Sequence, residues 1–384
     1  MNRLFAELPT TVFEVISGLA RERGAVNLGQ GFPEGPGPED VRAKAAEAAL
    51  HGYNQYPPMA GLPELRSAVA AHYGRFQGLE LEPEQVLVTS GATEAIAASI
   101  FALVEPGDEV VLIEPSYDAY LPLVRRAGGV PRFVSLRPPE WRLTEAALAG
   151  TFGAKTRLVL FNNPMNPAAR VFDAEETALL AEFCRRFDAV AVCDEVWEHV
   201  VFDGRRHIPL ISLPGMAERA VKIGSAGKMF SLTAWKVGFV CAAPRLLSAI
   251  AKAHQFLTFT TPPNLQAAAA YGLGKDAAYF EGMRAEYQRG RDRLAAALTE
   301  GGYVVLPSEG AYFLCVDLEA SGVRADDATF CRRAVEEAGV GAIPISAFYA
   351  TEPVTNIVRL CFAKSDATLD EGAARMIRAR KMMG

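Results

Sequence analysis

The chain has 384 residues, half of them apolar, and a formal net charge of -6. Its length predicts two or three structural units, at roughly one per 100–200 residues, and its composition is that of a globular protein. The negative charge argues against a general nucleic-acid binder. No apolar run reaches the ~20 residues of a membrane helix and no signal peptide is evident, so we expect a cytoplasmic protein.

The six cysteines and five histidines show no spacing typical of a disulfide framework or a metal site. No two cysteines form a C-x-x-C pair, and most of them lie in apolar runs. Cysteines in such runs usually behave as small buried apolar residues. We therefore expect neither disulfides nor a bound metal.

The first 39 residues contain one predicted helix and an ordered loop. Apolar residues recur at helical spacing from Thr10 to Arg23, and Gly24 ends the pattern. Glycines and prolines then stand beside apolar residues over 27–38, which indicates an ordered loop rather than a flexible linker. We expect segment 1–39 to pack with a smaller domain at the end of the chain.

Residues 40–275 alternate between apolar strands and helices. The predicted strands are 85–89, 109–113, 131–136, 157–161, 189–193, 221–224 and 237–242, with helices at 92–104 and 174–187. Near-continuous apolar strands between helices indicate an α/β domain with a large mixed, mostly parallel sheet covered by helices. Such sheets bind ligands beyond the carboxyl ends of their strands.

Residues 276–384 predict a smaller α+β domain. A long charged helix is expected over 277–300, closed by Gly301 and Gly302. The remaining predicted elements are strands at 303–306, 312–317, 341–344 and 356–362, a helix at 326–338 and a final helix from residue 367.

The run from Ile223 to Ser231 places Lys228 after an apolar strand and a turn of small residues. Small residues let a planar ring approach the backbone closely. A lysine amine in such a pocket can form a Schiff base with a carbonyl compound. The same pattern also fits a surface lysine that follows a strand.

Polar residues end two further predicted strands. Asp194 follows an apolar strand, where a buried carboxylate needs a partner such as a protonated pyridine nitrogen, or else caps a helix. The run Asn162–Pro167 follows another strand. An asparagine there is placed to donate a hydrogen bond to a ring oxygen, although Asn-Pro pairs also mark plain turns.

The run Thr89–Glu94 joins a strand to a helix, whose free N–H groups favour a phosphate. Ser225 and Lys236 are candidates to add a hydroxyl group and a positive charge to such a site. The sequence contains no P-loop and no G-x-G-x-x-G motif, which argues against a nucleotide.

The run Ser225–Gly238, with Lys228 and Lys236 inside it, resembles the lysine signature of class I aminotransferases of fold type I, which use pyridoxal phosphate. Further motifs resemble the subgroup of kynurenine aminotransferase, glutamine transaminase K and bacterial methionine aminotransferase. These motifs lie at 27–33, 54–56, 113–115, 213–216 and 359–364. The similarity covers nearly the whole chain, in the expected order.

This resemblance implies a role in cofactor binding for each matching residue. Lys228 would hold pyridoxal phosphate and move the proton, Asp194 would pair with the pyridine nitrogen, Asn166 would bond the phenolic oxygen, and Tyr117 would stack on the ring. The phosphate would be held by Ala92, Thr93, Ser225 and Lys236. Tyr56 would reach the cofactor phosphate of a neighbouring subunit, which implies a homodimer with shared sites.

The resemblance also implies a site for amino and 2-oxo acids. Arg359 would clamp the substrate carboxylate, with Gly31 and Asn166 beside it. Four aromatic residues suggest an apolar side-chain pocket, although each also fits ordinary core packing: Phe13, Tyr117, Phe259 and Phe348. Without a second arginine, the expected donors are neutral and large, such as methionine, glutamine, phenylalanine or kynurenine, in a ping-pong reaction.

Two departures from the family pattern stand out. Trp197 replaces a tyrosine that donates to the cofactor's ring oxygen, and we expect the indole to pack there instead. Ala168–Arg170 replaces a glycine-containing turn, which we expect to alter only loop shape. A carbon–sulfur β-lyase on the same scaffold stays open as an alternative. A cofactor-sensing regulator would need a DNA-binding extension, for which we find no segment.

Overall fold

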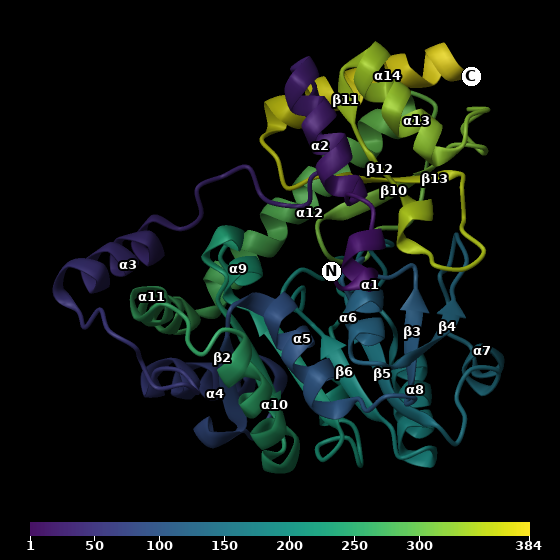
Figure 1. Ribbon diagram of the computed structural model, residues 1–384. Helices are drawn as coiled ribbons and strands as arrows, with labels where there is room; N and C mark the ends of the chain where they lie inside the picture. The colour runs from purple at the N-terminus through teal and green to yellow at the C-terminus, as the bar shows by residue number, and fades with distance from the viewer.

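The centre of the molecule is a seven-stranded sheet, in a computed structural model that describes residues 1–384 (Figure 1). In sheet order the strands are β2 (Val86–Thr89), β8 (Gly238–Ala242), β7 (Ala220–Ser225), β6 (Val190–Asp194), β5 (Thr156–Asn162), β3 (Glu109–Glu114) and β4 (Val130–Ser135). Strand β8 runs antiparallel to both of its neighbours, and all other pairs are parallel. The predicted mixed, mostly parallel sheet is therefore confirmed.

Side chains from the central strands enter two separate apolar clusters. Along β6, Val190 and Val192 belong to one cluster, whereas Ala191 and Cys193 belong to the other. Successive residues of a strand point to opposite faces, so both faces of this sheet are buried. Helices cover both faces, which explains why the strands are apolar along nearly their whole length (Figure 1).

The helices around this sheet are α4 (Pro63–Gln77), α5 (Gly91–Leu103), α6 (Tyr120–Arg126), α7 (Glu145–Ala149), α8 (Ala174–Arg186) and α10 (Pro244–Leu257). Helix α8 begins at a capping box of Asp173 and Glu176, which satisfies two otherwise unpaired N–H groups. Helices α3 (Glu39–His51) and α11 (Pro263–Leu273) pack together and project to one side of the molecule (Figure 1).

A second, antiparallel sheet lies above the first in Figure 1. Its strands are β12 (Ile343–Pro344), β13 (Ile357–Cys361), β10 (Phe313–Asp317) and β9 (Val304–Val305). It is accompanied by α13 (Asp327–Arg333), α14 (Asp366–Met383) and α12 (Ala277–Glu300), which rises from the level of the large sheet (Figure 1). None of the helices combines the length and apolar character required to span a bilayer.

The N-terminal segment lies against this upper part of the molecule. Helix α2 (Val12–Arg23) ends at Gly24 in the left-handed conformation, and β1 (Val26–Asn27) pairs in parallel with β11 (Val340–Gly341). Helix α1 (Arg3–Glu7) instead contacts α6, on the large sheet. The division into segments 1–39, 40–275 and 276–384 stays a prediction.

Candidate active site

A hollow of about 590 Å³ opens beyond the carboxyl ends of β5 and β6, in the size range of small-molecule sites. It lies where the register sets Asn162 of β5 beside Asp194 of β6. The residues singled out from the sequence that line it are Phe13, Gly31, Ala92, Thr93, Tyr117, Asn166, Asp194, Trp197, Lys228 and Arg359. The fold thus gathers residues from distant parts of the chain at one edge of the sheet.

Lys228 lies in the short helical turn α9 (Ala226–Met229), directly after β7 ends at Ser225. Burial lowers the pKa of its amine to about 8, although the charge of Asp194 opposes this shift. Its Nζ atom donates a long hydrogen bond of 3.5 Å to the Tyr312 hydroxyl and lies 4.9 Å from the centre of the Trp197 ring. The neutral amine that a nucleophile requires is therefore far more populated near neutral pH than in an ordinary lysine.

Asp194 ends β6 as a buried carboxylate with one oxygen unpaired. Tyr120 donates a hydrogen bond of 2.6 Å to its Oδ2 atom, whereas Oδ1 has no partner. Burial raises the pKa of this carboxyl group, and the bond from Tyr120 acts in the opposite direction. A buried acceptor without a partner is uncommon in proteins. The N–H of a protonated pyridine ring fits this vacant acceptor.

Arg359, on β13, is a buried cation without a carboxylate partner. Its Nη1 donates to Oδ1 of Asn166 at 2.7 Å, and its Nη2 donates to the carbonyl oxygen of Gly29 at 2.9 Å. Its Nε has no partner. Burial lowers the pKa of Arg359 to about 10, so the side chain is still charged at neutral pH. A guanidinium group in this state is suited to a substrate carboxylate.

Gly31 lies where the backbone must pass close to this arginine. A Cβ atom added there would lie 2.9 Å from Phe313 ring carbons and 3.6 Å from Nη2 of Arg359. Its carbonyl oxygen accepts a hydrogen bond of 2.8 Å from the Tyr312 hydroxyl. The close packing leaves no room for a side chain at this position.

The first turn of α5 lies at the hollow, where we expected an anion site. Ala92 and Thr93 line the hollow there, and N–H groups at a helix start have no partner within the helix. Lys236 lies behind this turn, since a Cβ atom added to Gly91 would meet its Nζ at 3.4 Å. Ser225 faces Gly238 in the register of β7 and β8. Both Ser225 and Lys236 thus lie near the helix start but outside the lining of the hollow.

The expected aromatic residues divide into two groups. Phe13 and Tyr117 line the hollow. Phe348 does not line it, but its ring packs edge-to-face on the ring of Phe13, with the ring centres 5.6 Å apart. Tyr56 and Phe259 lie away from the hollow of their own chain, 78% and 39% exposed. Their rings face each other at 5.4 Å. Phe259 therefore does not contribute to the substrate pocket within a single chain.

The two departures from the family pattern have different surroundings. Trp197 is buried, with its ring edge-to-face against Tyr312 at 4.1 Å. Arg170, in the altered turn, forms ion pairs with Glu176 at 2.5 Å and Glu309 at 3.1 Å, outside the hollow. The indole thus packs beside Lys228, and the altered turn belongs to the protein's framework.

Several contacts in the site were not predicted. Tyr120 is the first residue of α6, and Tyr117 lies three residues before it, outside the helix. Tyr312 and Phe313 stand in an apolar run that reads as ordinary core. Asn162 donates from its amide to the backbone oxygen of Asp194 at 2.8 Å. Phe313 and Asn162 line the hollow, whereas Tyr120 and Tyr312 contact residues that line it, and only the fold brings them together.

A buried charged cluster lies next to Asp194 along the chain. Ligand atoms of Glu195, Glu198 and His207 lie within 4.8 Å of one another, as in a metal site. The ammonium group of Lys222 donates to Glu195 at 2.5 Å and to Glu198 at 2.6 Å. The lysine therefore already provides the cation for these carboxylates.

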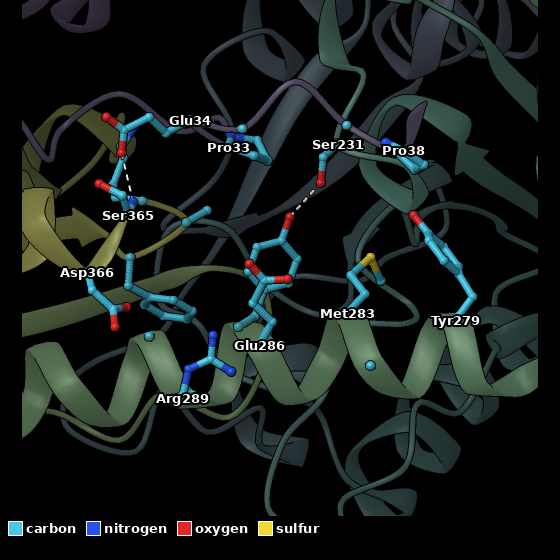
Figure 2. A pocket seen from close by; sticks show the side chains of 18 of the residues that line it. Pro33, Glu34, Pro38, Ser231, Tyr279, Met283, Glu286, Arg289, Ser365 and Asp366 are labelled. Atoms are coloured by element: carbon cyan, nitrogen blue, oxygen red, sulfur yellow. Dashed lines mark hydrogen bonds between the residues drawn. The ribbon is translucent and has the colours of Figure 1, made fainter. Parts of the chain in front are cut away.

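A larger hollow of about 950 Å³ lies between the loop at 33–38 and α12 (Figure 2). Figure 2 shows Met283 and Tyr279 standing on the helix below the loop with Pro33 and Pro38. The loop is held at one end by Glu34, which accepts from the backbone N–H of Ser365 at 2.8 Å (Figure 2). None of the residues predicted to act in catalysis lines this hollow.

Comparison with known proteins gives a consistent picture. The family model described as aminotransferase class I and II matches residues 23–376. A probable N-succinyldiaminopimelate aminotransferase of Mycobacterium tuberculosis is 44% identical over 380 residues, or 96% of this chain and 95% of that protein. The solved structure of the N-succinyldiaminopimelate aminotransferase from that organism superimposes with a TM-score of 0.95, covering 98% of this chain and 99% of that one at 44% identity.

Two further relatives carry other substrate names. The methionine aminotransferase of Escherichia coli is 40% identical over 372 residues, which cover 96% of each chain. Kynurenine–oxoglutarate transaminase 1 of Homo sapiens is 37% identical over 386 residues, which cover 91% of each chain.

Proposed function

Because this chain belongs to the class I and II aminotransferase family, we propose that it transfers the amino group of a large, neutral amino acid to a 2-oxo acid, with pyridoxal phosphate as cofactor. The resemblance first read from the lysine motif is confirmed by the family match. The residues that act in the reaction and the choice of donor are part of the proposal. The unpaired Oδ1 atom of Asp194, beside the amine-bearing Lys228, is the observation that carries it.

The residues of the hollow match the parts of pyridoxal phosphate. When bound, this group supplies a carbonyl carbon for the amino group and a ring that accepts electrons. Lys228 would hold it covalently, Asp194 would keep its ring nitrogen protonated, and Tyr117 would cover one ring face. The N–H groups of Ala92 and Thr93 would hold the phosphate, with Ser225 and Lys236 close behind.

The substrate would be positioned by Arg359 and the loop at Gly31. The carboxylate of an amino acid would act as the counter-ion that Arg359 lacks. Asn166 already orients the guanidinium group of Arg359 through a hydrogen bond of 2.7 Å. Lys228 would then move the proton of the α-carbon through its Nζ atom, the one buried amine in the lining of the hollow. Amino donor and 2-oxo acceptor use the same clamp in turn, so the kinetics should be ping-pong.

The charges in the hollow favour neutral donors. Arg359 is the only arginine in its lining, and the other acidic residue there besides Asp194 is Asp118. Burial raises the pKa of the Asp118 carboxyl group, although Arg359 opposes this shift. A side-chain carboxylate on the substrate would therefore lie near Asp118 without a cation of its own, which costs free energy.

We also propose a homodimer with shared sites. Tyr56 and Phe259 form an exposed aromatic pair that does not reach the hollow of its own chain. In a dimer this pair would complete the site of the partner subunit. The exposed position of both rings supports this proposal.

A second candidate donor is N-succinyl-diaminopimelate, because the relative with that name is 44% identical over 96% of this chain. Its additional carboxylates would need cations at the mouth of the hollow, supplied by residues other than Arg359. A carbon–sulfur β-lyase is the third outcome, since it would use the same Lys228 and Asp194.

A donor panel separates these possibilities. The purified protein is supplied with pyridoxal phosphate and its visible absorbance is recorded. Assays then follow with methionine, glutamine, phenylalanine, kynurenine, aspartate, N-succinyl-diaminopimelate and a cysteine S-conjugate. We expect the neutral donors to be fastest and aspartate to be poor. Fastest turnover of N-succinyl-diaminopimelate would select the second candidate, and release of thiol and pyruvate from a cysteine conjugate would reveal the lyase. Aspartate as the fastest donor would contradict the proposed specificity.

A further inference from the structure

The amine of Lys228 rests between two aromatic residues. Its Nζ atom lies 3.5 Å from the hydroxyl oxygen of Tyr312, its only hydrogen-bond partner, and 4.9 Å from the centre of the Trp197 ring. The two rings meet edge-to-face, with their centres 4.1 Å apart. The amine therefore has a defined resting position when it is free.

The hydroxyl group of Tyr312 has its single proton committed elsewhere. It donates to the carbonyl oxygen of Gly31 at 2.8 Å, in the loop beside Arg359. The lone pairs of the phenolic oxygen are then available to accept a hydrogen bond from Lys228. The ring of Tyr312 is buried against Trp197 and Phe313, so this orientation is fixed by packing.

We propose that Tyr312 is a positioning residue, whose hydroxyl group holds the free amine of Lys228 in place while that amine carries the substrate proton. This inference rests on the proposed function, because it assigns a role within the same reaction. The Trp197 ring completes the resting position by offering its face to the protonated amine.

The proton step balances at Nζ of Lys228. This atom would take the proton from the α-carbon of the donor and become an ammonium group, while the electron pair of the broken C–H bond would pass to pyridoxal phosphate, which accepts electrons when bound. The ammonium group would later release the same proton, which regenerates the amine. A buried ammonium is costly without a partner, and the Tyr312 oxygen is the acceptor that it meets.

The test compares Tyr312→Phe with Tyr303→Phe. Both substitutions remove one buried hydroxyl that donates to a backbone carbonyl at 2.8 Å, Gly31 in one case and Met376 in the other, but only Tyr312 contacts Lys228. Stopped-flow absorbance follows the first half-reaction with methionine and with α-deuterated methionine.

For Tyr312→Phe we expect kcat to fall about 10- to 100-fold, the scale of a misplaced reacting group, with KM nearly unchanged. The deuterium isotope effect should rise, because the proton step becomes slower relative to binding. Tyr303→Phe should match the wild type in kcat and in the isotope effect. Replacing Tyr312 by 3-fluorotyrosine keeps the shape but weakens the acceptor, so it should give an intermediate loss even if the phenylalanine variant folds poorly.

A second readout follows the amine itself in enzyme loaded with pyridoxamine phosphate, where Lys228 is free. Acetylation of Lys228 by acetic anhydride is measured by mass spectrometry relative to the exposed Lys381. We expect Lys228 to react several-fold faster in Tyr312→Phe, because the amine loses its only hydrogen bond, and at the wild-type rate in Tyr303→Phe.

Equal kcat, isotope effect and acetylation in Tyr312→Phe and the wild type would overturn the role of Tyr312 while the proposed function stands. A wild-type protein that binds no cofactor and converts no donor would overturn the proposed function itself.

Discussion

Two buried lysines on either side of the end of β7 have opposite surroundings. Lys222 lies between two carboxylates, which raise its pKa above its usual value although burial opposes this. Lys228 meets only a hydroxyl group and aromatic rings, and burial lowers its pKa to about 8. Burial by itself does not make a lysine reactive; the absence of a paired carboxylate does.

The adjacent acids Asp194 and Glu195 repeat this contrast. The charges of Lys222 and His207 lower the pKa of Glu195 to about 2 in spite of its burial, and its Oε1 atom accepts from the N–H of Leu210. Asp194 has a raised pKa and an unpaired oxygen. The two carboxylates around Lys222 have their cation, whereas the carboxylate of Asp194 has an oxygen atom left for a ligand.

Replacing Lys228 should give the largest effect on activity. Lys228→Ala should lower the rate of transamination by at least about 10⁴-fold, because covalent attachment and proton transfer are both lost. The measurement is the rate of 2-oxo acid formation from methionine, with Lys381→Ala on the exposed surface as the control. Residual activity above a hundredth of the wild type would mean that another group moves the proton.

Replacing Lys222 should act on stability instead. Lys222→Met leaves Glu195 and Glu198 buried without their cation, so the free energy of unfolding should fall by about 3–5 kcal/mol. Denaturant unfolding measures this loss, and adding Glu195→Gln with Glu198→Gln should recover part of it. A loss below about 1 kcal/mol would show that the cluster is not a stabilising network.

The pH dependence of the free energy of unfolding should report the low pKa of Lys228. In the cofactor-free protein the pKa of Lys228 is about 8, below its ordinary value of 10.5, so the folded state binds fewer protons between these values. Stability should therefore rise by up to ~3 kcal/mol as the pH increases from about 8 to about 10.5. Lys228→Met should lack this part of the rise. A difference between the two proteins that does not change with pH would contradict the low pKa.

Arg359 is the third buried cation in this comparison, and like Lys228 it forms no ion pair with a carboxylate. Arg359→Ala should weaken amino and oxo acid binding by about 1.5–3 kcal/mol, the scale of hydrogen bonds to a charged group. KM for methionine reports this loss, and the cofactor content should be unchanged. An unchanged KM would mean that the substrate carboxylate binds elsewhere.

Apolar patterns predicted most of the large sheet. The expected strand 157–161 is observed as Thr156–Asn162, because its residues are buried on both faces. The helix 277–300 has the expected bounds, since Asp276 caps its start and a glycine follows its end. These elements are set by local chemistry that the sequence displays directly.

Other elements and contacts depend on tertiary structure, so the sequence pattern did not predict them. The single strand expected at 341–344 is two short strands, because β11 pairs with β1 and β12 pairs with β13. The expected helix 326–338 changes at Ala334 into a π-helical turn. Tyr120 and Tyr312 contact Asp194 and Lys228 from separate elements, and a long-range contact leaves no local pattern.

The central claim is that Lys228, and not Lys222 or Lys236, holds the cofactor. Borohydride reduction of the cofactor-loaded enzyme, followed by proteolysis and mass spectrometry, tests it directly because reduction makes the attachment permanent. We expect the visible absorbance to vanish and the added mass to lie on the peptide that contains Lys228. Recovery of the cofactor on any other lysine, or on none, would contradict the assignment of this site.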